Sequence, residues 1–287
     1  MKLRIFLLVS LGFLFSSCTQ AQEKKEIHAS DFLKDVKKGK AVSVANKIIL
    51  DDVNFFVSEK NLQLAGSNRL ENVVDGNIFF VNCIFMGNVS AVGEYKSVGV
   101  QTKFNNNLIF QNCDFRGDVV FDNAVVMGTA DFQQAKFRKN ASFNNMMIWA
   151  KDSYFSEIEA EGTVNFIYAT FNGNLYMRDA VFQKPVSFQG VTVQGQFAAS
   201  GMNCLQSAEF DMITVGQRAI FNYSTFAKQP TFIQARFHDD AEFVGDTLQN
   251  LNEVFENTYV AGKLLIGESV APARLKVEQN LLQNKEN

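Results

Sequence analysis

The sequence contains few of the residues on which most enzymes and small secreted domains depend. Its 287 residues include only 2 histidines, 4 cysteines and 3 prolines. This leaves little for a zinc enzyme or a disulfide-stabilised scaffold. The formal net charge of −3 gives no strong field for nucleic acid, so no nucleic-acid partner is expected. Hydrophobic residues still make up 47% of the chain, which excludes a disordered or collagen-like protein.

The N-terminus has the features of a secretory signal. Lys2 and Arg4 precede an apolar run over residues 5–15, and two small residues, Ser16 and Ser17, then precede Cys18. A basic start, a short apolar core and a small-residue site predict a signal peptide over residues 1–17. The apolar run is too short to span a membrane as a mature helix.

The stretch Phe15-Ser16-Ser17-Cys18 resembles a bacterial lipobox. This resemblance implies that Cys18 is lipidated and becomes the first mature residue, with residues 18–29 as a tether to the membrane. It also implies a bacterial cell-envelope protein. No acidic run follows Cys18, which favours an outer-membrane lipoprotein that faces the periplasm.

Phenylalanine is the residue in excess, with 29 copies, and it recurs with a regular spacing. Large apolar residues follow one another at alternating steps of five and six residues, a period that neither an α-helix nor a β-strand produces. The misfit after Phe110 is a seven-residue step from Ile148 to Phe155. The series begins Phe110, Phe115, Phe121, Val126, Phe132, Phe137, Phe143, Ile148, and it is predicted to end Val254, Tyr259, Leu265, Val270.

A second column of small residues lies two positions before many of these centres, as at Ala130 before Phe132 and Ala135 before Phe137. Two inward residues separated by one outward residue describe a very short strand. Four steps make a turn of 22 residues, and stacked turns bury a core that one repeat could not bury alone. Counting in fours places Phe110, Phe115, Phe121 and Val126 on the first to fourth faces of this solenoid.

Segments such as Ala130-Asp131-Phe132-Gln133-Gln134-Ala135-Lys136-Phe137 resemble the pentapeptide-repeat proteins. The resemblance implies an all-β fold, a right-handed quadrilateral parallel β-helix with about 22 residues per turn. We assign this β-helix to residues 41–270.

The ends of such a solenoid need covering, because open strand edges pair with other chains. We expect a short N-terminal capping helix within residues 30–40, with Ser30 or Asp31 as its N-cap and Gly39 after its end. Residues 271–287 are predicted to form a C-terminal helix or a tail. A homodimer through one solenoid end is a further expectation.

Two segments depart from the repeat. About eight extra residues between Val92 and Lys103 predict a protruding loop, and Ser58 to Glu71 fits the spacing poorly and indicates a second excursion. With the first loop removed, Cys83 and Cys113 lie one turn apart. They form either a disulfide or a pair of core thiols.

One cluster of outward residues is the candidate interaction site. Met127, Met147 and Trp149 project from the fourth face, while Tyr154 and Tyr176 project from the first face of the next turns. The seven-residue step forms the corner between them. A lone tryptophan beside tyrosine and methionine indicates a binding surface, and the alternative is a set of scattered surface apolar residues.

The sequence contains no Ser/His/Asp set, phosphate-binding loop or clustered metal-ligand spacing, so no catalytic residue, metal or cofactor is expected. We therefore predict a non-catalytic structural or interaction module that binds an unidentified envelope protein or glycan. One alternative is a β-helix enzyme that processes envelope polysaccharide, although acids such as Asp131 and Glu242 are dispersed around the faces. The other is a DNA-mimicking, gyrase-protecting pentapeptide protein, which the signal peptide and mild charge disfavour.

Overall fold

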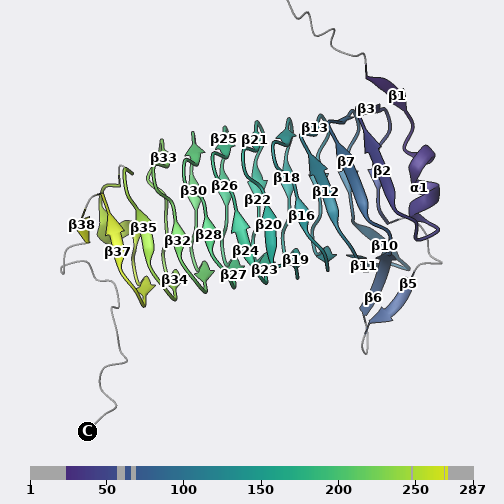
Figure 1. Cartoon of the computed structure of the whole chain (residues 1–287). Coiled ribbons are helices and arrows are strands. Elements are labelled where there is room, and N and C mark those ends of the chain that lie inside the picture. The colour runs from purple at the N-terminus through teal and green to yellow at the C-terminus, as the bar shows by residue number, and fades with distance from the viewer. Residues whose placement is uncertain (1–23, 57–61, 66–68, 247, 268, 271–287) are drawn as a thin grey trace, which may run out of the picture.

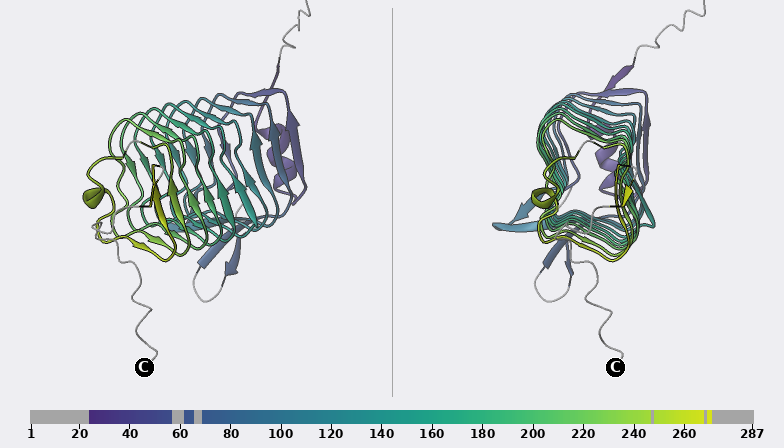
Figure 2. Two further views of the ribbon diagram at one scale, coloured as in Figure 1. Left: turned by 60° about the vertical axis from the view of Figure 1, so that its left-hand side comes forward. Right: turned by 90° about the vertical axis from the view of Figure 1, so that its left-hand side faces the viewer.

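The chain folds into a four-sided parallel β-solenoid of about ten turns with about 22 residues in each turn. A computed structural model describes residues 24–56, 62–65, 69–246, 248–267 and 269–270. Viewed along its axis, the body has a four-sided outline (Figure 2), and the buried side chains form one core inside it. The predicted signal peptide, Cys18 and the C-terminal segment 271–287 lie outside the described residues.

Four sheets form the four sides, and the chain visits them in a fixed order on each turn. The first sheet contains β2 (Val42–Ala45), β7 (Ile78–Val81), β12 (Leu108–Gln111), β16 (Ala130–Asp131), β20 (Asp152–Tyr154), β24 (Asn174–Tyr176), β28 (Phe197–Ala198), β32 (Ala219–Ile220), β35 (Ala241–Phe243), β37 (Leu264–Ile266) and β38 (Ser269–Val270). The second sheet contains β1 (Lys25–Ile27), β3 (Lys47–Ile49), β8 (Ile84–Phe85), β13 (Asp114–Phe115), β17 (Lys136–Phe137), β21 (Glu159–Ala160), β25 (Val181–Phe182), β29 (Asn203–Cys204) and β33 (Thr225–Phe226).

The third and fourth sheets complete each turn. The third sheet contains β4 (Val53–Asn54), β9 (Val89–Ser90), β14 (Val119–Val120), β18 (Ala141–Ser142), β22 (Val164–Asn165), β26 (Val186–Ser187) and β30 (Ala208–Glu209). The fourth sheet contains β5 (Leu62–Ala65), β6 (Arg69–Val74), β10 (Gly93–Tyr95), β11 (Val98–Phe104), β15 (Val125–Val126), β19 (Met147–Ile148), β23 (Thr170–Phe171), β27 (Thr192–Val193), β31 (Thr214–Val215), β34 (Arg236–Phe237) and β36 (Tyr259–Val260).

The predicted inward centres form the core. Every centre from Phe110 to Phe221 is buried, and the phenylalanines stack in columns along the axis. On the third side, for example, the ring of Phe188 stacks on those of Phe166 and Phe210 with centroids 5.2 and 4.9 Å apart. The core therefore accounts for the phenylalanine bias of the sequence.

The corners explain the polar residues between the centres. At two corners of each turn a residue such as Asn112 or Asn123 takes a positive φ, a conformation that asparagine tolerates better than most side chains. At the other corners, Asn or Asp side chains accept backbone N–H groups from the next turn. Asp118 Oδ1 accepts from Asn140 N, and Asn140 Oδ1 accepts from Thr163 N, each at 3.1 Å. These side chains tie successive corners together.

Helix α1 (Ser30–Val36) covers the N-terminal end of the solenoid, inside the range expected for the cap (Figure 1). Its Phe32 ring contacts that of Phe80 with centroids 5.1 Å apart. The N-cap residue is Ala29, with no side-chain cap, so the prediction of Ser30 or Asp31 was wrong. The carboxylate of Asp51 instead accepts the Ala29 N–H at 3.1 Å, at the start of the helix.

Part of the segment that the sequence analysis assigned to a tether belongs to the solenoid. Residues 18–29 were assigned to the tether, but Lys25–Ile27 forms β1 and pairs in parallel with β3. The solenoid therefore begins before the capping helix, and the helix is inserted between the first two strands of the chain.

At the C-terminal end the predicted centres shift by one residue. Helix α2 (Leu251–Val254) lies in this turn, and Phe255, rather than Val254, stacks on Phe232 with centroids 5.3 Å apart. Val260 then pairs with Phe237 in place of the predicted Tyr259. The same shift places Ile266 opposite Phe243, where Leu265 was expected.

Both predicted excursions are antiparallel hairpins that project near the N-terminal end (Figure 1). Strands β5 and β6 form one, and β10 and β11 form the other. Among the described residues, no helix has the length and apolar character needed to cross a membrane.

Candidate interaction surface

The centre of the candidate site is a pair of tyrosines on the outer side of the first sheet. Strands β20 and β24 pair in parallel with Tyr154 opposite Tyr176. Their rings stack with centroids 5.3 Å apart and an interplanar angle of 12°. The Arg178 guanidinium lies 5.7 Å from the centroid of the Tyr176 ring. The parallel register fixes the tyrosine pair, because it sets the two residues directly opposite each other on neighbouring strands.

Polar side chains hold the tyrosine pair in place. Asn174 Nδ2 donates to Asp152 Oδ1 at 2.8 Å and contacts the Tyr176 hydroxyl at 3.4 Å. Burial, followed by the charge of Asp152, raises the pKa of Tyr154. The hydroxyl therefore stays protonated at neutral pH and remains a hydrogen-bond donor.

Asp131 precedes Tyr154 in the same outward column and is 5% exposed. Its carboxylate accepts hydrogen bonds from Gln111 Nε2 at 2.7 Å and from the Gln133 N–H at 2.9 Å. Burial raises the pKa of Asp131. Both carboxylate oxygens are engaged by neighbouring groups, so this acid supports the surface rather than standing free in a groove.

The seven-residue step forms the corner beside the tyrosines. Trp149 follows β19 directly and is 52% exposed, and its backbone N–H donates to Val126 O at 2.9 Å. The additional residue is accommodated before β20, where Lys151 O accepts the Asn174 N–H at 2.7 Å. Met127 occupies the equivalent corner position one turn earlier and is also exposed.

The five predicted residues therefore lie at three places. Tyr154 and Tyr176 are in direct contact, and Trp149 and Met127 lie on the adjoining corner. Met147 is half-buried on the fourth sheet, between Val125 and Thr170. Among the described residues, the Trp149 ring stacks on no other ring. We call these five residues the aromatic corner.

Sequence reasoning missed Arg178 and Asn174, which complete this surface. Asn174 could have been found from the strand period, because it lies in β24 two residues before Tyr176, whereas Arg178 follows the end of that strand. The search for apolar outward residues passed over them.

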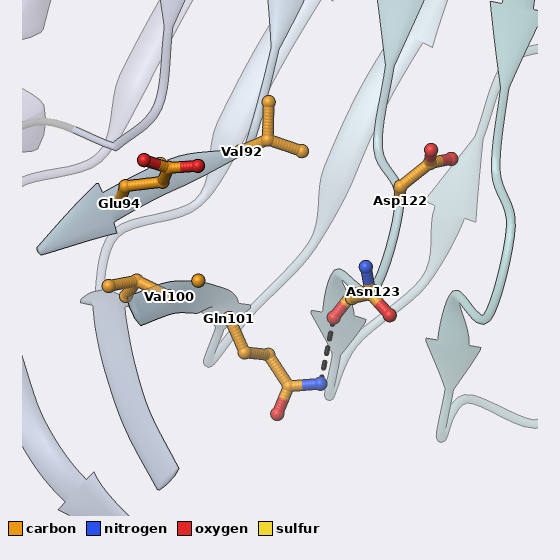
Figure 3. Close-up of a pocket in the computed structure, with 8 residues that line it drawn as sticks. Val92, Glu94, Val100, Gln101, Asp122 and Asn123 are labelled. Atoms are coloured by element: carbon orange, nitrogen blue, oxygen red, sulfur yellow. Dashed lines mark hydrogen bonds between the residues drawn. The ribbon is translucent and has the colours of Figure 1, made fainter. Parts of the chain in front are cut away.

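A hollow separate from the aromatic corner lies where hairpin β10–β11 leaves the body (Figure 3). This cavity of about 430 Å³ is lined by residues that include Glu94, Val100 and Asp122. Gln101 Nε2 donates to Asn123 O at 2.7 Å across it. The hairpin is thus tied to the solenoid wall.

Cys83, Cys113 and Cys204 are free, buried thiols. Of the two alternatives left open by the sequence, the structure has the pair of thiols. Burial raises the pKa of Cys204 to about 12, so this thiol is unreactive at neutral pH. No group of three or more histidine, cysteine, aspartate or glutamate side chains in the described part of the chain is placed to hold a metal ion.

Residues 100–147 match the family model described as pentapeptide repeats, nine copies. The match includes Met127 and Met147 of the aromatic corner and ends just before Trp149. No curated protein and no solved structure matches the chain.

Proposed function

We propose that this protein, whose fold is a pentapeptide-repeat β-solenoid, is a lipid-anchored, non-catalytic module of the bacterial cell envelope that binds a partner protein through the aromatic corner. Pentapeptide-repeat solenoids are in general non-enzymatic interaction modules. The observation that carries the proposal is the exposed Trp149 beside the stacked Tyr154–Tyr176 pair.

The composition of the surface supports a protein partner. Tryptophan, tyrosine and arginine are the residues that most often dominate protein–protein binding energy, and methionine is also enriched at interfaces. Here Tyr176 and Arg178 lie on the first sheet, and Trp149 lies on the corner that adjoins it. The tyrosines are also held rigidly, which lowers the entropy lost on binding.

The ring geometry favours a protein over a glycan. A sugar ring binds best on an open aromatic face, but Tyr154 and Tyr176 turn one face of each ring toward the other. Arg178 lies over the Tyr176 ring as well. On the Tyr176 ring, what remains accessible is ring edge, hydroxyl and guanidinium, which suit backbone and side-chain groups of a polypeptide.

A non-catalytic role is supported by the arrangement of acids around this surface. Asp131 accepts two hydrogen bonds, Asp152 binds Asn174, and Glu242 pairs with Arg218 at 3.2 Å. Hydrolysis or elimination on a polysaccharide needs an acid and a base converging on one groove. These carboxylates instead hold neighbouring side chains and backbone groups of the solenoid in place.

The location rests on the N-terminal sequence. The lipobox-like segment that ends at Cys18 supports an acylated outer-membrane protein facing the periplasm. Cys18→Ser should move the protein from the membrane fraction to the soluble periplasmic fraction. Retention of Cys18→Ser in membranes, with no labelling of the wild type by a fatty-acid analogue, would contradict the anchor.

Binding is tested separately, by cross-linking to purified envelope proteins. We expect a saturable cross-linked product that Trp149→Ala and Arg178→Ala reduce at least tenfold. Leu205→Ala is the matched control, because Leu205 is an exposed apolar residue on the second sheet, 45% accessible. Equal cross-linking of all variants would reject the aromatic corner. A saturable change in Trp149 fluorescence with envelope glycans alone would replace the protein partner by a glycan.

A further inference from the structure

A pair of thiols lies on the second side of the solenoid, away from the aromatic corner. Cys83 and Cys113 are 30 residues apart because the β10–β11 hairpin intervenes. The register nevertheless makes them direct neighbours, since Ile84 pairs with Asp114 and the Asp114 N–H donates to Cys83 O at 2.8 Å. The two side chains therefore occupy the same position on consecutive turns.

Each thiol has backbone oxygens as hydrogen-bond partners: Cys83 Sγ donates to Val44 O at 3.5 Å and to Val81 O at 3.4 Å, and Cys113 Sγ donates to Phe80 O at 3.5 Å and to Gln111 O at 3.4 Å. The two cysteines are 0% and 1% exposed, respectively. They also line a small cavity of about 190 Å³, together with Lys24 and Arg138. The pair is shielded from bulk water but lies below an opening.

The spacing of the turns suits a bridging cation better than a disulfide. Adjacent parallel strands hold equivalent residues about 4.8 Å apart, whereas a disulfide needs Cβ atoms about 3.8 Å apart. Two thiolate–metal bonds of about 2.3 Å each span about 4.6 Å, close to the spacing that the solenoid imposes. A linear sulfur–metal–sulfur unit therefore fits along the axis without moving either strand.

The donor set selects the kind of cation. Two thiolates without a third ligand do not satisfy zinc, which takes four ligands in a tetrahedron. Soft thiolate donors favour Cu(I) among the common first-row ions. We propose that Cys83 and Cys113 form a two-coordinate Cu(I) site between two turns of the solenoid. This inference departs from the sequence expectation of no metal.

The surroundings match the charge of such a complex. Binding replaces two S–H protons with one Cu(I), so two protons leave and the site gains a single negative charge, with no change in oxidation state. The Lys24 ammonium donates to Asn82 Oδ1 at 2.9 Å and lines the same cavity as Cys83 and Cys113, so a positive charge lies close to the pair. A buried anion next to a fixed cation costs far less than an isolated one.

The test is an anaerobic titration of the reduced full chain with Cu(I) in competition with a chromogenic Cu(I) chelator. We expect wild type to take up one more Cu(I) per chain than Cys83→Ser, and Cys113→Ser to show the same loss. Comparison with these variants cancels any binding at Cys18. Cys204→Ser is the matched control, a buried thiol outside the pair, and should bind as wild type does.

Circular dichroism of each variant separates loss of binding from loss of fold. As a second measurement, X-ray absorption of the loaded protein should show one copper environment with two sulfur ligands, absent from Cys83→Ser. Lys24→Ala should weaken Cu(I) binding about tenfold, the usual effect of removing a supporting group. Equal Cu(I) uptake by wild type and Cys83→Ser would overturn the proposal. So would stoichiometric binding of Zn(II) by the Cys83–Cys113 pair.

Discussion

The rings of Phe166 and Phe188 stack one turn apart, with centroids 5.2 Å apart and an interplanar angle of 7°. Both side chains are fully buried. Phe166 also stacks on Phe143 at 4.9 Å and meets Phe155 edge-to-face at 5.2 Å. One ring therefore contacts phenylalanine rings in three successive turns, so its removal leaves a cavity that no single turn can fill.

Phe166→Ala is expected to lower the free energy of unfolding by about 4 kcal/mol, the usual cost of emptying a buried phenylalanine site. The reason is that neighbouring turns are held by hydrogen-bonded sheets and cannot collapse into the cavity. Thermal unfolding followed by circular dichroism measures the effect. Tyr168→Asn is the control, since Tyr168 is 53% exposed and has a positive φ that asparagine accepts. Equal melting temperatures would contradict the assignment of the third column.

The sequence predicted the body of the fold because one physical rule repeats through it. Each turn must bury the same positions against the turn before, so the five-and-six spacing appears in the chain itself, from Phe110 to Phe243. The rule fails where the turn changes length. Helix α2 shifted the last centres to Phe255 and Val260, and no periodic signal marks such an insertion in advance.

The candidate site was predictable only as a set of outward positions. The strand period placed Tyr154 and Tyr176 on one side, and the register brought them into contact. It did not show that Arg178 lies over the Tyr176 ring, because the direction of a long surface side chain depends on rotamers rather than on register. The thiol pair was similar, because the repeat spacing placed Cys83 and Cys113 on neighbouring turns but did not show whether they were bonded.

A second prediction concerns the polar ladder at the corners. Asn140 Oδ1 accepts the Thr163 N–H at 3.1 Å, while the Asn140 N–H donates to Asp118 Oδ1. Asn140→Ala should lower the free energy of unfolding by about 1 kcal/mol, since one acceptor of a backbone donor is lost. Asn140→Asp keeps an oxygen in place and should lose less. Lys139→Ala, at the exposed neighbouring position, is the control, and chemical denaturation is the measurement. If Asn140→Ala is as stable as Lys139→Ala, water has replaced the Asn140 side chain as acceptor, and the ladder adds nothing to stability.

The corner that carries Trp149 supplies a third prediction. A Cβ added at Gly173 would lie 2.0 Å from Lys151 O, so any larger residue must displace the corner of the preceding turn. We expect Gly173→Ala to destabilise the fold by about 1–3 kcal/mol, as overpacking does, and to shift the Trp149 emission spectrum. Gly99→Ala is the matched control, because a Cβ there meets nothing within 4 Å. An unchanged melting temperature and emission spectrum in Gly173→Ala would contradict the close approach.

The pH dependence of stability near the C-terminal end follows from Asp246. Burial raises the pKa of this carboxyl to about 7, although the Ser224 N–H donates to its Oδ1 at 2.6 Å. Its Oδ2 is buried and has no hydrogen-bond partner among the described residues. The folded state thus prefers the protonated acid, whereas the unfolded chain ionises near pH 4.

Between about pH 4 and pH 7 the folded protein therefore binds more protons at Asp246 than the unfolded chain does, and stability falls as the pH rises through this window. Asp246→Asn keeps an oxygen for the Ser224 N–H and removes the charge. We expect the variant to be more stable than wild type at pH 8 by about 1–2 kcal/mol, after allowance for partial exposure to solvent. At pH 4 the difference should nearly vanish. Asp239→Asn is the control, because Asp239 is an exposed residue at a corner of the solenoid, and it should leave the pH profile unchanged. A wild-type stability that rises between pH 5 and pH 7, in parallel with that of Asp246→Asn, would show that the carboxyl ionises freely in the folded state.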